Sequence, residues 1–136
     1  MAKITRTTLA IERDLLAKFD AWMAAHGYSN RSQAMRDLIR QTLVQAEWNK
    51  PKAKVVASLA IIYDHAAHTL AQQLAGLQHE DHHAILCSQH VHLDHNTCLE
   101  VILMQGPAAR LRRVCDCIIA TRGVQAGKLT LLSTNV

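Results

Sequence analysis

The sequence predicts an α+β protein of two units, a strand-helix-helix segment over residues 1–48 and a βαββαβ segment over residues 54–136. Three observations lead to this prediction. Apolar residues recur at strand spacing and at helical spacing in that order along the chain. A polar stretch that contains a proline, residues 49–53, separates the two patterns and predicts a linker. Eight of the nine histidines lie between His65 and His95, whereas the excess of positive charge lies in residues 1–50.

The first unit begins with a β-prone stretch, residues 4–11. Apolar residues at helical spacing follow over residues 15–23, and Gly27 is suited to end that helix. The segment from Asn30 to Gln33 matches a capping box and predicts the start of a second helix. A lone strand cannot stand by itself, so we expect it to pair with the same strand of a second chain. The result would be a dimeric two-stranded ribbon, which fits the major groove of DNA.

This first unit resembles a ribbon-helix-helix DNA-binding domain, most clearly in Asn30-Arg31-Ser32-Gln33-Ala34-Met35-Arg36-Asp37. The resemblance implies that the outward residues of the ribbon contact bases, and that the second helix directs its N-terminus at a phosphate. Free N–H groups and the helix dipole favour an anion at that position. The implied base-contacting residues are Arg6, Thr8 and Ala10, and the implied phosphate-binding residues are Asn30, Arg31, Ser32 and Arg36.

The second unit has the element order of a ferredoxin-like domain, also described as ACT-like. Its strands are apolar, and turn residues such as Asp94, Asn96 and Gly106-Pro107 separate the segments. The predicted elements are a strand over residues 55–63, a helix from Asp64 to about residue 78, a loop over 79–83, a hairpin over 86–104, a helix over 108–120 and a strand over 128–132.

The hairpin carries the most informative residues of the chain. Side chains alternate along a strand, so His90 and His92 share one face. A loop centred on His95 would place His92 opposite Cys98 and His90 opposite Glu100, with paired Cβ atoms roughly 4.5–5.5 Å apart. A slip of one residue would send Cys98 to the other face. Two imidazoles and a thiol on one face predict a metal site, and the spacing alone does not exclude tetrahedral zinc.

Composition narrows the class of protein. The chain has 136 residues, 49% of them hydrophobic, which is enough for a packed core. No apolar run reaches transmembrane length and the first residues do not form a signal peptide, so we expect a cytoplasmic protein without a membrane anchor. The four cysteines show no disulfide framework and should remain thiols. The formal net charge of +4, concentrated in the first unit, is compatible with a polyanion partner.

The two-unit organisation and the run Gln78-His79 … His90-Val91-His92-Leu93-Asp94-His95 … Cys98-Leu99-Glu100 together resemble the nickel-responsive transcriptional regulators over essentially the whole chain. The resemblance implies a repressor that binds a palindromic operator as a homotetramer, a dimer of dimers, with Ni(II) as its cofactor. It implies a square-planar metal site that joins two subunits, and a planar site of nitrogen and sulfur ligands is typical of Ni(II) or Cu(II). The implied ligands are His90, His92 and Cys98 of one chain and His79 of another.

Several further positions follow from the same reasoning. We expect Glu100 to hold a ligand imidazole through its free N–H group, the alternative being a surface carboxylate. Gln33 stands where family members can carry a glutamate that helps to bind an interdomain cation, whereas Asp37 is retained. Ala10 replaces a polar ribbon residue, so base contact there would be apolar. Other histidines are candidates for a weaker or alternative metal site: His65, His82, His83 and His95.

Two other functions compete with this interpretation. A ribbon-helix-helix regulator could sense another metal or a small molecule through its ACT-like domain. A metalloenzyme is disfavoured, because four protein ligands would close the metal site and no general base accompanies it.

Overall fold

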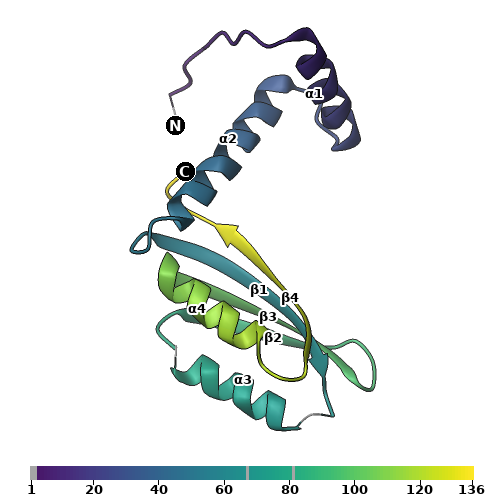
Figure 1. Cartoon of the computed structure of the whole chain (residues 1–136), viewed down its shortest axis with the longest axis vertical. Coiled ribbons are helices and arrows are strands. Elements are labelled where there is room, and N and C mark those ends of the chain that lie inside the picture. The colour runs from purple at the N-terminus through teal and green to yellow at the C-terminus, as the bar shows by residue number, and fades with distance from the viewer. Residues whose placement is uncertain (1–2, 67, 81) are drawn as a thin grey trace. The chain divides into compact units, whose positions relative to one another are not determined.

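The computed structural model describes residues 3–136 except residues 67 and 81, and the chain forms two compact units, Met1–Arg40 and Gln41–Val136. Helix α2 crosses the division, so its residues 31–40 are described with the first unit and the rest with the second. The elements are α1 (Arg13–Ala25), α2 (Arg31–Trp48), β1 (Lys54–Asp64), α3 (His68–Glu80), β2 (Ile85–His92), β3 (Thr97–Pro107), α4 (Ala108–Ile119) and β4 (Val124–Leu132) (Figure 1). The α+β prediction is confirmed.

The first unit contains both predicted helices. Helix α1 ends at Ala25, and Gly27 follows with a positive φ of 75°, a conformation that costs glycine little. The Asn30 side-chain oxygen accepts a hydrogen bond from the Gln33 backbone N–H at 3.2 Å, which is one half of the predicted capping box. Residues 3–12 form neither helix nor strand in the single chain. Their expected strand partner belongs to a second chain, so the ribbon stays a prediction.

The second unit is a four-stranded antiparallel sheet in the order β2-β3-β1-β4. This order and the sequence of elements confirm the ferredoxin-like arrangement. Burial alternates along β1, because its inward residues face two helices and its outward residues do not. Helices α3 and α4 cover one side of the sheet and add Leu70, Leu74, Leu111 and Ile118 to the same core (Figure 1).

Several element limits differ from the prediction. Strand β3 continues through Gly106 and Pro107, which were expected to end it, and helix α3 begins at His68 and not at Asp64, which is the last residue of β1. Helix α3 continues to Glu80, so His79 lies in its last turn and not in a loop. Strand β4 begins at Val124 and not at Lys128, because pairing with the long central strand β1 recruits Ala126 and Gly127 despite their weak strand propensity. A Cβ atom at Gly127 would meet the Ile119 side chain at 2.7 Å, which explains a glycine at this position.

Trp48, the last residue of α2, is an anchor of the second unit. Its side chain is 1% exposed and belongs to the core cluster. Its indole N–H donates a hydrogen bond to the Leu132 carbonyl at 3.0 Å, and the Arg112 guanidinium lies 5.3 Å from the ring centroid. The expected linker at residues 49–53 is a turn between α2 and β1.

We predict that Trp48→Ala lowers the free energy of unfolding by about 3–5 kcal/mol, because it removes a large buried side chain and leaves a cavity. Trp48→Phe should cost less, since it keeps most of the packing and loses one hydrogen bond worth about 0.5–1.5 kcal/mol. Urea unfolding of the metal-free protein measures both. Equal midpoints for Trp48→Ala and the unmodified chain would show that the anchor does not stabilise the unit.

Candidate metal centre

The hairpin has the predicted register. His90 pairs with Glu100 and His92 pairs with Cys98 across strands β2 and β3. The Asp94 carboxylate accepts hydrogen bonds from the backbone N–H groups of Asn96 and Thr97, each at 2.8 Å, and thereby closes the turn. These hydrogen bonds lower the pKa of the Asp94 carboxyl group. The turn therefore sets which side chains of the two strands face each other.

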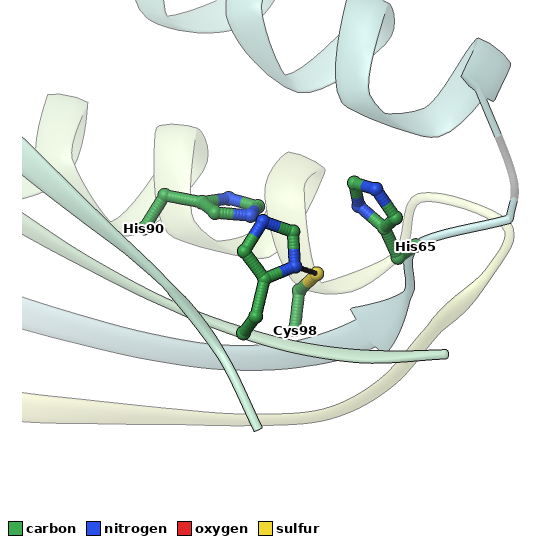
Figure 2. Close-up of side chains that lie close together, drawn as sticks. His65, His90 and Cys98 are labelled. Atoms are coloured by element: carbon green, nitrogen blue, oxygen red, sulfur yellow. Dashed lines mark hydrogen bonds between the residues drawn. The ribbon is translucent and has the colours of Figure 1, made fainter. Parts of the chain in front are cut away.

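Four metal-binding side chains converge beside this hairpin. One donor atom from each of His65, His90, His92 and Cys98 lies within 4.8 Å of all the others. Figure 2 shows His65, His90 and Cys98 directed toward a common point. The Cys98 sulfur lies 3.5 Å from Nδ1 of His92. The three imidazoles are exposed and the cysteine is fully buried at the base of the group.

These residues fit a divalent metal ion. Nitrogen and sulfur ligands lie roughly 2.0–2.3 Å from such an ion, so donors on opposite sides of it are at most about 4.6 Å apart. The observed spacing needs only small side-chain movements to meet that limit. Imidazole and thiolate ligands suit Ni(II), Cu(II) and Zn(II). Three of the four predicted ligands, His90, His92 and Cys98, are thus brought together within one chain.

The fourth predicted ligand, His79, does not join this group within the described part of one chain. It is exposed in the last turn of α3, with its ring centroid 6.2 Å from that of His82. Its place is taken by His65, which directly follows β1. The sequence reasoning named His65 only as a candidate for an alternative site. That His79 serves another chain stays a prediction, because the structure describes one chain.

A buried hydrogen-bond network orients His90. The Tyr63 hydroxyl donates to a Glu100 carboxylate oxygen at 3.2 Å and lies 2.9 Å from Nδ1 of His90. Because that hydroxyl proton is used on Glu100, its oxygen accepts the Nδ1–H of His90, which leaves Nε2 free to bind a metal. The Gln78 amide donates to the other Glu100 oxygen. A hydrogen bond to the ring nitrogen that does not bind the metal fixes the orientation of a ligand histidine.

Glu100 is therefore buried, at 7% exposure, and is not a surface carboxylate. Its link to the His90 imidazole runs through Tyr63, whereas the sequence reasoning expected direct contact. Tyr63 and Gln78 were assigned no role from the sequence. A signal for Tyr63 was present, because a tyrosine on the inward face of an apolar strand needs a partner for its hydroxyl group. Burial and the Glu100 charge raise the pKa of the Tyr63 hydroxyl, so it stays a donor.

Of the other three cysteines, Cys115 is a packing residue, whereas Cys87 and Cys117 are exposed. Cys115 is fully buried in the core, and burial raises the pKa of its thiol to about 12. Cys117 is exposed on the other side of α4. Two positions apart on a helix, Cys115 and Cys117 do not share a face, and neither belongs to the donor group found among the described residues.

The predicted DNA-contacting residues lie in two places in the first unit. Arg6, Thr8 and Ala10 are exposed in the segment before α1. Asn30, Arg31, Ser32 and Arg36 are exposed around the start of α2.

Two charged residues near α2 already have partners. Arg31 forms two hydrogen bonds with the Asp20 carboxylate, at 2.8 and 2.6 Å, and this pairing lowers the pKa of the Asp20 carboxyl group. Asp37, which the sequence reasoning placed with Gln33 in a possible cation site, accepts hydrogen bonds from Tyr28 and Arg40. A cation at Asp37 would have to share the carboxylate with both groups.

Two helices after a β-prone segment, ahead of a ferredoxin-like domain with a His3Cys donor group, indicate a metal-responsive DNA-binding regulator. Two family models match the chain: "Ribbon-helix-helix protein, copG family" over residues 5–46 and "NikR C terminal nickel binding domain" over residues 56–132. The chain belongs to the NikR family of nickel-responsive regulators. It is therefore a nickel-responsive DNA-binding transcriptional regulator and not an enzyme.

Relatives named as nickel-responsive regulators match nearly the whole chain. Those of Solibacter usitatus (strain Ellin6076) and Nitratidesulfovibrio vulgaris (strain DSM 19637 / Miyazaki F) are each 46% identical over 134 residues. That of Trichlorobacter lovleyi is 39% identical over 133 residues. Each match covers 98% of this chain and 96% of the relative. Among the described residues, no helix is both long and apolar enough to cross a membrane.

We predict that Tyr63→Phe lowers nickel affinity about 10–100-fold, the usual effect of removing a group that orients a metal ligand. The substitution keeps the aromatic ring and removes only the hydroxyl group between Glu100 and His90. Competition with a chelator measures the affinity. Tyr28→Phe in the first unit is the matched control and should bind nickel as the unmodified chain does. Equal affinities for the two variants would exclude the network from metal binding.

Nickel affinity should also depend on pH through Cys98. Burial raises the pKa of its thiol, and nearby carboxylates raise it further, so the metal-free protein carries a protonated thiol near neutral pH. Because nickel binds the thiolate, binding releases this proton and weakens about tenfold for each unit by which the pH falls. Titrations from mildly alkaline to neutral pH should show this slope. Cys98→Ser should flatten it, and an unchanged slope would mean that Cys98 is not a ligand.

Proposed function

We propose that this regulator is a repressor that binds a palindromic operator in the cytoplasm when Ni(II) is bound. The observation that carries the proposal is the convergence of His90, His92 and Cys98 on one hairpin face, in a chain whose first unit matches a ribbon-helix-helix model. The active assembly is a homotetramer, in which ribbon dimers bind DNA and the ferredoxin-like domains join the dimers.

In this proposal the regulatory nickel site is shared between two chains. His90, His92 and Cys98 come from one chain and His79 from another. Two features support this assignment. The imidazoles of the hairpin are exposed, so a second chain can reach the ion from the open side. His79 is exposed at the end of a helix, where it is available to a neighbouring chain.

Exposed apolar residues of the first unit support the ribbon dimer. Ile4, Leu9 and Leu15 are 79%, 65% and 57% exposed in the single chain. Leu9 and Leu15 line an apolar groove with Phe19 and Met35. An exposed apolar groove of this kind marks an interaction surface. In this proposal a second copy of residues 4–11 covers the groove and pairs the strand backbones, and Arg6 and Thr8 face the DNA. Ala10, the third proposed contact, also lines the groove in the single chain.

The start of α2 supplies phosphate contacts in the proposed complex. Its free backbone N–H groups and positive helix end favour a phosphate beside Asn30 and Ser32. Arg36 adds a positive charge in the next turn. Arg31 is paired with Asp20, but both groups are exposed and water screens their attraction. A DNA phosphate can therefore replace Asp20 as the partner of Arg31.

We predict that Arg6→Ala abolishes specific operator binding and leaves the fold intact. Arg6 is exposed, and a bidentate contact between arginine and guanine contributes roughly 1–3 kcal/mol of base discrimination. Gel-shift titration against the operator and against unrelated DNA separates specific from general binding. Lys18→Ala, which removes an exposed charge from α1, is the control. Unchanged operator affinity for Arg6→Ala would exclude this residue as a reader of bases.

His79→Ala should fold and dimerise, but nickel should no longer raise its operator affinity. The physical reason is that nickel then no longer links two chains and cannot bias their arrangement. Operator binding with and without nickel, together with sedimentation, measures this effect. In the unmodified protein the coupling must be reciprocal, so operator DNA should tighten nickel binding by the same factor, typically about 5–150-fold. A nickel-responsive His79→Ala protein, or an unmodified protein that sediments only as a dimer, would contradict the mechanism.

A further inference from the structure

A groove between helices α3 and α4 lies outside the metal centre and has no role in the proposed function. The two helices cover the same side of the sheet, and both line the groove, which has a volume of about 320 Å³ (Figure 1). This volume suits a small organic molecule. The lining residues are Leu77 and Glu80 of α3 and Arg110, Arg113, Val114 and Cys117 of α4.

The described lining of the groove carries more positive than negative charge. Arg110 and Arg113 lie three positions apart on α4, so their guanidinium groups occupy the same wall. Arg113 is exposed and forms no ion pair with any residue that the structure describes. Glu80 supplies the one carboxylate of the described lining. Two guanidinium groups and one carboxylate leave a net charge of +1, which a ligand with one negative charge would balance.

The more buried part of the groove is apolar. Val114 is buried at 7% exposure, and Leu77 is half-buried. These side chains offer no hydrogen bond to a polar group, so the uncharged part of a ligand would lie against them. On the adjoining wall, guanidinium groups bind carboxylates through charge-assisted hydrogen bonds and often pair with both oxygens. The lining therefore combines a carboxylate-binding wall with an apolar floor.

We propose that this groove binds a small monocarboxylate, with its carboxylate at the two arginines and its apolar stem over the floor. Glu80 repels a second negative charge, so a dicarboxylate binds more weakly. Leu77 and Glu80 belong to the same last turn of α3 as His79, and an occupied groove would tie that turn to α4. Any effect on nickel through His79 rests on the proposed function, whereas binding of the monocarboxylate does not.

Cys117 reports directly whether the groove is occupied, because its thiol is exposed and lines the groove. Alkylation of the metal-free full chain with iodoacetamide is followed by mass spectrometry. Cys87, which is exposed on strand β2 and does not line the groove, is the internal control. Hexanoate should slow alkylation of Cys117 along a saturable curve, about tenfold at ten times its dissociation constant, and leave Cys87 unchanged. Hexanamide, which has the same stem without the charge, should not protect Cys117, and succinate should protect it less than hexanoate does.

Three variants test the roles of the lining. Arg113→Gln should raise the hexanoate concentration for half-maximal protection about tenfold, because it removes a charge-assisted contact. Lys128→Gln, which removes an exposed charge from strand β4, is the matched control and should respond as the unmodified chain does. Glu80→Gln should increase protection by succinate. Each rate is compared with that of the same variant without ligand, so a change in the reactivity of the thiol itself does not affect the result.

The inference is overturned if hexanoate does not slow alkylation of Cys117, or if it slows alkylation of Cys87 equally. It is also overturned if hexanamide or succinate protects Cys117 as well as hexanoate does, or if Arg113→Gln and the unmodified chain respond at the same concentration. These measurements use neither nickel nor DNA. Failure of the proposed function is a different result, namely an unmodified protein whose operator affinity does not respond to nickel.

Discussion

The metal centre depends on one constraint, the antiparallel register between β2 and β3. The register places His92 opposite Cys98 and His90 opposite Glu100. Because side chains alternate in a strand, a shift of one residue would send the thiol to the opposite face and leave two imidazoles without it. The Asp94 carboxylate protects the register by accepting two backbone hydrogen bonds in the turn. A short polar turn thus determines the chemistry of a site several residues away.

The central strand β1 connects this site to the core. Its inward residues are apolar up to Ile61. The last inward residue is Tyr63, whose hydroxyl group donates a hydrogen bond to buried Glu100. A buried carboxylate is costly unless its oxygens have donors, and here Tyr63 and Gln78 supply them. The same hydroxyl orients the His90 ring. The same hydrogen-bond network therefore stabilises the sheet and orients the metal ligand His90.

The two units differ in how much of their apolar surface a single chain buries. The ferredoxin-like unit buries its apolar residues in a core of its own, anchored at one end by Trp48. The first unit leaves Ile4, Leu9 and Leu15 exposed, since too few residues are present to cover them. Such a unit gains stability by association with another chain. The apolar residues of the first unit and the three imidazoles of the metal centre are both surfaces that one chain leaves open.

The sequence by itself predicted the order of the elements from α1 to β4, the hairpin register and three of the metal-binding side chains. These features depend on local periodicity, on turn residues and on alternation, all of which are short-range properties. Only the tertiary structure decided that His65 joins the group. The pairing of β1 with β3 brings together residues 33 positions or more apart in the chain, as Asp64 opposite Thr97 and Tyr63 opposite Cys98 illustrate. The tertiary structure likewise decided that β4 begins at Val124, where pairing with a long neighbour outweighs weak propensity. Long-range contacts of this kind have no periodic signature in the sequence.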